Sequence, residues 1–255
     1  MTDLVGDPWA ALRSVTRARV GLGRAGDGLP TSRVLDLAAD HALARDAVHD
    51  ALDVDLLHRQ LAGLGPALVV DSAARDRTEY LQRPDLGRRL STAARGQLQP
   101  GGADLAVVLA DGLSARAVHA HAVPLLRDLL PLLEGWVVGP PVIARQARVA
   151  LGDEVGERLG ARLVLVLLGE RPGLSAADSL GAYLTWGPRP GRRDSERNCV
   201  SNIRPPHGLT TATAARTLAR LLTSARSRGL TGVALKDDHP ELPARPVPPL
   251  PEAAP

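Results

Sequence analysis

The sequence predicts an α/β fold, with a mainly parallel sheet, helices on both faces in a Rossmann-like arrangement, and a small helical N-terminal domain before it. After residue 64, short apolar runs alternate with segments of helical pattern. Wholly apolar strands are buried on both faces, and their alternation with helices is typical of parallel sheets. The chain also has three Trp, two Tyr and no Phe. Leu, Val and Ala must therefore form the core, which suits helices packed on a sheet.

The N-terminal segment is expected to be helical. The pattern of apolar residues predicts helices over residues 8–16, 31–49 and 56–64. Gly65 and Pro66 end the third of these helices, because this pair favours a turn. The residues up to 64 are therefore expected to form a helical domain of their own.

The residues that follow supply the sheet and its covering helices. The strands are expected at 67–70, 105–110, 142–150, 163–168 and 232–235, and the helices at 115–133, 154–159 and 211–227. The expected organisation is a helical N-terminal domain at 1–64, an α/β domain at 65–238 and a Pro-rich disordered tail at 239–255.

The charge pattern and the single cysteine limit the class of protein. The formal net charge is +3, and all but one of the 31 basic residues are arginines, dispersed among carboxylates. Nucleic-acid-binding proteins usually concentrate basic residues on one face, so no nucleic-acid partner is expected. Cys199 is the one cysteine, and the sequence has no secretion signal and no apolar run of membrane-spanning length. We expect a soluble cytoplasmic protein without a membrane partner.

The stretch "GLGRAG" at residues 21–26 matches the glycine pattern of dinucleotide-binding sites. Such a site requires a buried strand before the glycines and a helix directly after them. Here a short charged segment precedes the glycines, and the helix begins only after "DGLPT". We interpret the stretch as a surface loop. A Rossmann-type oxidoreductase that binds NAD is the alternative function.

The stretch "ADGLSARAVHAHA" brings a serine and two histidines together without the spacing of a hydrolase. His119 and His121 are two apart, so they point in different directions on a helix. Ser114 is well placed to cap the helix that follows it. No G-x-S-x-G motif is present and no metal-ligand motif of Cys or His, so neither a catalytic triad nor a metal site is expected.

Two polar stretches later in the chain are candidates for ligand contact. In "GERPGL", Glu170 ends an apolar strand and Pro172 forces a turn, so a carboxylate lies at the rim of the sheet. A carboxylate accepts hydrogen bonds and donates none, so its natural partner is a ligand rich in N–H groups; a pairing with Arg171 is the alternative. The stretch "RNCVSNIRPPHGL" is polar and favours a turn. There Cys199 is either an inert small residue or a thiol with His207 as its base.

An ordered series of stretches resembles the small (light) subunit of ethanolamine ammonia-lyase. The series is "GLGRAGDGLPT", "DHALARDAVHDALD", "DRTEYLQRPDLGRRL", "ADGLSA", "GDEVGE", "GERPGL", "DSLGAYLT", "RNCVSNIR" and "TGVALKD". The resemblance covers roughly residues 19–238. Each stretch is weak evidence alone, but the order of the whole series is highly specific.

The resemblance implies a carbon-nitrogen lyase that uses adenosylcobalamin to turn ethanolamine into acetaldehyde and ammonia by a radical mechanism. In this family a large TIM-barrel subunit holds the substrate and the catalytic side chains. The small subunit is an obligate partner in a hetero-oligomer and supplies part of the cobalamin site. The resemblance thus places no catalytic residue on this chain.

The family's cobalamin contacts match Val149, Glu170 and Cys199 in this sequence. Their chemistry suits a corrin disc fringed by carboxamides: Val149 offers apolar contact, Glu170 accepts from an amide N–H, and Cys199 is small enough for close approach. Each residue is expected at or just past the end of a strand, on the rim where open α/β sheets bind ligands.

The cofactor is expected to keep its own dimethylbenzimidazole ligand, in the base-on form. Proteins that displace this base use a D-x-H-x-x-G motif, and the nearest stretch here is "DDHPEL" at residues 237–242. Leu242 stands where glycine is required, and Pro240 disrupts the loop. In many relatives the enzyme sits inside a bacterial microcompartment, addressed through the small subunit's N-terminus. That segment is short here, so free cytosolic enzyme is the other option.

Overall fold

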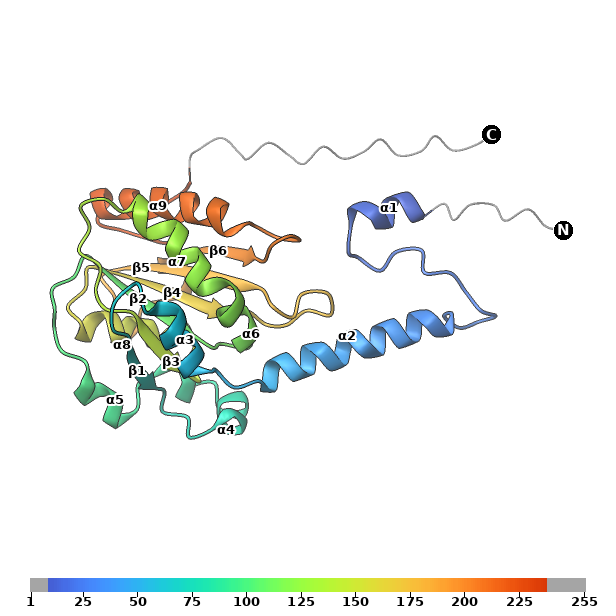
Figure 1. Cartoon of the computed structure of the whole chain (residues 1–255), viewed down its shortest axis with the longest axis horizontal. Coiled ribbons are helices and arrows are strands. Elements are labelled where there is room, and N and C mark those ends of the chain that lie inside the picture. The colour runs from blue at the N-terminus through green and yellow to red at the C-terminus, as the bar shows by residue number, and fades with distance from the viewer. Residues whose placement is uncertain (1–8, 238–255) are drawn as a thin grey trace. The chain divides into compact units, whose positions relative to one another are not determined.

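The computed structural model describes residues 9–237, and the chain divides into two compact units. The first unit contains residues up to Ala42, and the second spans Leu43–Asp237. The first contains α1 (Ala10–Val15) and most of α2 (Thr31–His49) (Figure 1). Helix α2 has the predicted bounds, and α1 confirms the first predicted helix in a shorter form.

The second unit contains the sheet and the helices that cover it. Its helices are α3 (Val54–Leu61), α4 (Arg77–Gln82), α5 (Thr92–Gln97), α6 (Ala115–Ala117), α7 (Val123–Leu129), α8 (Leu151–Arg158) and α9 (Thr211–Arg228). Its strands are β1 (Leu68–Asp71), β2 (Leu105–Ala110), β3 (Val142–Arg145), β4 (Leu163–Gly169), β5 (Leu180–Trp186) and β6 (Arg197–Ile203).

The six strands form one mixed sheet in the order β1-β3-β2-β4-β5-β6 (Figure 1). Strands β1 to β4 are parallel to their neighbours, as expected. Strand β5 is antiparallel to β4, and β6 is antiparallel to β5. The prediction of a mainly parallel sheet therefore holds for the first four strands, and the last two form an antiparallel extension that the sequence analysis missed.

Three expectations for the strands are corrected. Residues 232–235 form no strand, because Gly232 has a φ of 89° and turns the chain. The strand expected at 142–150 ends at Arg145, because Gln146 adopts a left-handed φ of 53°. The stretch around Cys199, interpreted as a turn, lies inside β6.

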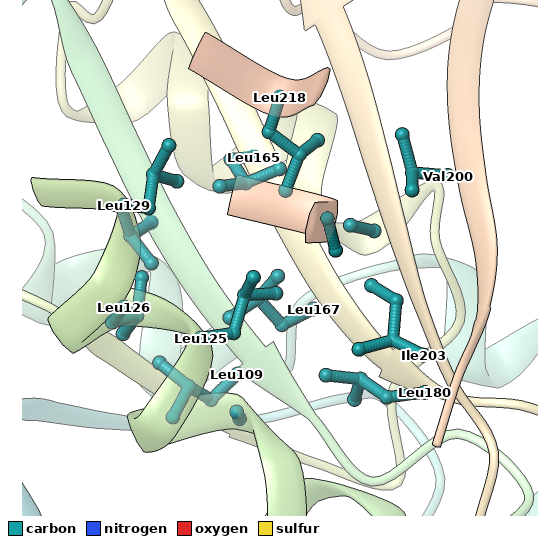
Figure 2. Close-up of a cluster of buried hydrophobic side chains, with 14 of the residues drawn as sticks. Leu109, Leu125, Leu126, Leu129, Leu165, Leu167, Leu180, Val200, Ile203 and Leu218 are labelled. Atoms are coloured by element: carbon teal, nitrogen blue, oxygen red, sulfur yellow. The ribbon is translucent and has the colours of Figure 1, made fainter. Parts of the chain in front are cut away.

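The sheet separates two hydrophobic cores. One lies under α3, α7 and α9, and Figure 2 shows side chains of α7, such as Leu125 and Leu129, meeting Leu165 and Leu167 of β4 and Leu218 of α9. The other core lies under α5 and α8 and contains the alternate residues of the same strands. Helices thus cover both faces, as predicted. On the α8 side, however, β6 carries an exposed residue, Cys199.

The helix expected at 115–133 is interrupted by a π-helical turn at Val118–Ala122, and both of its histidines lie within this turn. His119 Nε2 accepts a hydrogen bond of 2.9 Å from the backbone N–H of Asp53, the residue that caps α3. His121 lies on another side, with its Nε2 atom 3.8 Å from Asp178. The prediction that the two rings point apart is confirmed.

Acidification is expected to destabilise the fold through His119. Burial lowers the pKa of His119 below its ordinary value of 6.5, although Asp53 and Asp50 oppose the shift. The unfolded chain therefore binds more protons than the folded chain below about pH 6.5, and the free energy of unfolding falls there by at most about 1.4 kcal/mol per pH unit. We expect His119→Gln, which keeps a hydrogen-bond acceptor, to flatten this dependence in urea titrations from pH 8 to 5. An unchanged dependence of the free energy of unfolding on pH would contradict the assignment to His119. Burial also lowers the pKa of His121, which therefore adds to this pH dependence in the same direction in the wild type and in the variant.

Candidate functional site

Glu170 lies directly after β4, and the chain around it holds its carboxylate over the sheet. Its backbone N–H donates to Ser179 O at 2.9 Å. The buried Ser179 hydroxyl donates to Glu170 Oε2 at 2.5 Å, and the backbone N–H of Asn202 approaches the same oxygen at 3.4 Å. Within residues 9–237 no hydrogen bond reaches Oε1, and no ion pair joins Glu170 to Arg171. The carboxylate is thus oriented by one oxygen while the other remains available as an acceptor.

The end of β4 is fixed by two glycines that meet the loop after β2. A Cβ atom on Gly169 would come within 2.0 Å of Ser114 O, and one on Gly112 within 2.2 Å of Gly169 O. The backbone N–H of Leu113 donates to Gly169 O at 2.9 Å. Ser114 caps α6 as predicted, and its hydroxyl also donates to Ala177 O at 2.7 Å. The turn that follows Glu170 is therefore tied to the β2 loop.

Tyr183 and Cys199 continue this surface across the antiparallel extension. The two residues are paired in the β5–β6 register, and a hydrogen bond joins their side chains. The Glu170 side chain lies above Gly181, the neighbouring position on the same face as Tyr183. Partial burial, reinforced by the Glu170 carboxylate, raises the pKa of the Cys199 thiol, although the hydrogen bond with Tyr183 opposes the shift. A neutral thiol is a poor nucleophile, which disfavours a nucleophilic role for Cys199.

Val149 lies four residues beyond β3, in the turn that enters α8. It is partly buried and packs against the same core as Tyr183 and Leu168. The three predicted site residues therefore belong to one face of the sheet, the face covered by α8. The expectation that all three follow strand ends holds for Val149 and Glu170, whereas Cys199 lies within an edge strand.

The turn that carries Val149 is held by a buried carboxylate. Asp111, at the end of β2, accepts from the backbone N–H groups of Gln146 at 2.8 Å and Ala147 at 2.9 Å. The guanidinium of Arg77 pairs with the same carboxylate at 3.2 Å. The Tyr80 hydroxyl also donates to Ala147 O at 3.2 Å. These bonds stabilise the left-handed conformation of Gln146, which few residues other than glycine adopt.

Two consecutive acids of α8 have roles that the sequence analysis missed. Asp153 makes a bidentate pair with Arg197 of β6, at 2.6 and 2.7 Å, and both side chains are almost wholly buried. Glu154 accepts from Leu90 N at 2.9 Å and from Arg95 Nε at 2.6 Å. Acids near a helix N-terminus are favoured by the helix dipole. Here they also join α8 to segments on either side of it.

The remaining sequence patterns give no second site. Residues 21–26 form a loop within the first unit, and no strand lies between residue 9 and this loop, as predicted for a surface loop. Among the described residues there is no group of three or more side chains able to hold a metal ion. No helix between residues 9 and 237 has the length and apolar character needed to cross a membrane.

The amino-acid sequence matches a known family model and several curated proteins. The family described as "Ethanolamine ammonia-lyase light chain (EutC)" matches residues 6–236. A protein of Xanthomonas campestris pv. campestris is 55% identical over 241 residues, which cover 91% of this chain and 88% of the relative. A protein of Pseudomonas syringae pv. tomato is 52% identical, with 91% and 84% covered. One of Bradyrhizobium diazoefficiens is 54% identical over 238 residues, with 91% of each chain covered. All three relatives carry the name ethanolamine ammonia-lyase small subunit.

Proposed function

The chain belongs to the ethanolamine ammonia-lyase light-chain family, and we propose that it supplies part of an adenosylcobalamin site in complex with a large subunit. The family assignment supports a role in a lyase complex that acts on ethanolamine. We propose further that the large subunit holds the substrate and the catalytic side chains. On this chain, the surface formed by Val149, Glu170, Tyr183 and Cys199, called the cofactor face below, contacts the corrinoid.

The available oxygen of Glu170 is the observation that carries this proposal. A corrin ring is fringed by carboxamides, whose N–H groups need acceptors. Glu170 Oε2 is held by Ser179, whereas Oε1 has no hydrogen bond among the described residues. A hydrogen bond from an amide to a fixed carboxylate is stronger than one between neutral groups. The carboxamide N–H donors of the cofactor are thus matched by the carboxylate acceptor that the chain presents.

The other residues of the cofactor face suit the flat, apolar part of the ring. Val149 and Tyr183 are partly buried apolar surfaces on the same core. Cys199 is exposed and, with its raised pKa, uncharged near neutral pH, so a bulky ring can approach it without removing a charge from water. When bound, the cofactor supplies homolysis of its cobalt–carbon bond. The chain's own residues position the ring and exclude water.

We propose that the cofactor binds base-on, because no D-x-H-x-x-G motif supplies a histidine ligand to cobalt. The nearest stretch, from Asp237 to Leu242, lies outside the described residues from its second residue onward. A nitrogen-hyperfine spectrum of the reduced cofactor that showed histidine coordination in place of the benzimidazole would contradict this proposal. The Pro-rich residues 239–255, expected to be disordered, also lie outside the described range.

We propose that the N-terminal helical segment contacts the large subunit. Helix α2 is 19 residues long, and Ala47 is its one buried residue. Its exposed apolar residues are Val34, Leu35, Leu37 and Leu43. A soluble helix with this many exposed apolar side chains is typical of a surface that meets another protein. Free cytosolic enzyme and enclosure in a bacterial microcompartment remain the two localisations that this proposal allows.

Removing the Glu170 carboxylate is expected to weaken cofactor binding. For the complex co-purified with its large subunit, we expect Glu170→Ala to raise the dissociation constant of adenosylcobalamin about 10- to 100-fold, the range expected for a lost charge-assisted hydrogen bond. Glu170→Gln, which keeps a neutral acceptor, should raise it only a few-fold. The measurement is an absorbance titration of the apo complex.

Glu157→Ala is the matched control for this experiment. Glu157 is an exposed acid on α8 whose side chain makes no hydrogen bond within the described part of the chain. Its removal changes the net charge as Glu170→Ala does, but it should leave the affinity unchanged. If Glu170→Ala bound the cofactor as tightly as the wild type, the proposed role of this face would be wrong.

A further inference from the structure

A groove of about 670 Å³ lies at the N-terminal end of α8, where Ala150 and Glu154 line it. Two separate segments line it: one carries Arg88 and Arg89, and the other carries Arg192 and Arg193. Ala150, the residue after Val149, also lines the groove. The groove therefore begins one residue from a proposed cofactor contact.

The two consecutive acids of α8 hold the segments on either side of this groove. Glu154 accepts from the backbone N–H of Leu90, directly after the first arginine pair. Asp153 holds Arg197, whose guanidinium also donates to Arg192 O at 3.0 Å. Arg192 in turn donates to Gly187 O at 3.0 Å and pairs with Glu196 at 2.5 Å. Both walls are thus fixed to α8 by buried polar contacts.

The charge of the groove is positive where a ligand can reach it. Two of its acids are already paired: Asp85 with Arg83 at 2.9 Å and Glu154 with Arg95 at 2.6 Å. The third, Asp194, is exposed and lies 3.5 Å from Arg197, whose main partner is Asp153. By contrast, among residues 9–237 the guanidinium groups of Arg88 and Arg193 take part in no ion pair, and both residues are exposed. Two unpaired cations therefore face an opening in which two of the three carboxylates are already paired.

We propose that this groove binds a phosphate ester, and specifically the phosphodiester in the nucleotide tail of cobalamin. The proposal rests on the proposed function. A base-on cobalamin carries one phosphodiester between its corrin ring and its benzimidazole, so a protein that contacts the ring has this anion nearby. Guanidinium groups match the geometry of phosphate oxygens and bind them with paired N–H donors. The N-terminus of α8 adds a favourable dipole at the same end of the groove.

The test compares two corrinoids that differ in the tail. Adenosylcobinamide has the ring and the upper ligand but lacks the nucleotide and its phosphodiester. We expect the wild-type complex to bind adenosylcobalamin more tightly than adenosylcobinamide. In the double variant Arg88→Gln/Arg193→Gln, the dissociation constant of adenosylcobalamin should rise on the order of 10- to 100-fold, while that of adenosylcobinamide stays the same.

The control variant removes two arginines from the opposite side of the sheet. Arg216 and Arg228 lie on α9, which covers the other hydrophobic core. Arg216→Gln/Arg228→Gln makes the same change in net charge and should leave both affinities unchanged. Thermal melting of each complex verifies that the variants are folded, since all four arginines are exposed or partly exposed.

Each other outcome overturns the inference in a recognisable way. An equal loss of affinity for both corrinoids would show that the arginines contact the ring and not the phosphodiester. No loss of affinity for either corrinoid would show that the arginines do not contact the cofactor. Inorganic phosphate, titrated into the apo complexes, tests for a free anion. If it stabilised the wild type and not the variant while both bound adenosylcobalamin equally, the groove would hold free phosphate instead. A wild-type complex that bound neither corrinoid would refute the proposed function itself.

Discussion

Replacing Arg197 by Met is expected to lower the free energy of unfolding by about 3–5 kcal/mol, the range for breaking a buried ion pair. The Asp153 and Arg197 side chains are 1% and 2% exposed, and Arg197 also donates to the Thr185 hydroxyl at 2.9 Å. Without the guanidinium, Asp153 would remain buried as a carboxylate without a counterion. The contacts between α8, β6 and the turn at Arg192 would be lost together.

The loss should depend on pH in a direction that identifies its cause. In the wild type, burial raises the pKa of Asp153 and Arg197 opposes that shift. Without Arg197 the folded-state pKa rises further, so the folded variant binds a proton more tightly than the unfolded chain does. Stability of the variant relative to the wild type should therefore increase as the pH falls from 7 towards 5. Urea titrations at several pH values measure this.

Two further variants separate the buried charge from the loss of packing. Asp153→Leu/Arg197→Met removes both charges and should recover most of the stability, because buried pairs are often replaceable by apolar residues. Arg145→Met breaks a pair of similar geometry, with Asp71 at 2.6 Å, whose side chains are 47% and 46% exposed. It should cost less than about 1 kcal/mol. If Arg197→Met cost no more than Arg145→Met, the buried pair would not be a principal link of this fold.

The central part of the fold could be predicted from sequence because its residues are uniformly apolar. Strand β2 is buried at every position, so its bounds at Leu105–Ala110 follow from the apolar run alone. Helix α2 is predicted by the pattern of its apolar residues and by Pro30 before it, and its bounds at Thr31–His49 agree with that prediction. The antiparallel extension lacks these signals. Strand β6 is an edge strand with exposed polar residues such as Ser201, and these were interpreted as a turn.

The candidate site could be predicted only where a single residue marks it. Glu170 stands between an apolar strand and Pro172, so its place at the rim was readable from the sequence. Tyr183 was missed, although β5 alternates between residues of one core, Leu180, Ala182 and Leu184, and residues of the opposite face. This alternation of residues with a period of two is the sequence signal from which strand β5, and the position of Tyr183 on its other face, could have been predicted. The link from Asp153 to Arg197 joins residues 44 apart, and no local pattern predicts such a contact.

Replacing Gly169 by Ala is expected to destabilise the fold by at least about 3 kcal/mol, at the upper end for overpacking, because the new methyl group meets backbone and not side chain. Its Cβ would lie 2.0 Å from Ser114 O and 2.5 Å from Asp111 O. Neither carbonyl can turn away by a rotamer change. The end of β4 would have to separate from the β2 loop, and the Leu113 N–H bond to Gly169 O would weaken.

Gly96→Ala is the matched control, since it makes the same chemical change where there is room for it. Gly96 lies inside α5, and no atom is within 4 Å of its added Cβ. Alanine there should stabilise the protein by about 0.5–1 kcal/mol, because glycine is a poor helix former. The same substitution of glycine by alanine is thus expected to lower the free energy of unfolding at Gly169 and to raise it at Gly96. Chemical denaturation of both variants tests the two expectations together.

The Gly169 variant also tests whether the position of the end of β4 determines cofactor binding at the cofactor face. Because Glu170 follows Gly169 directly, a displaced strand end moves the carboxylate relative to Ser179 and Tyr183. At a temperature where Gly169→Ala is still folded, we expect its affinity for adenosylcobalamin to fall at least as far as that of Glu170→Ala. Gly96→Ala should bind the cofactor as the wild type does. A Gly169→Ala protein of wild-type stability would show that the strand and the loop do not approach this closely, and the orientation inferred for Glu170 would then lose its structural basis.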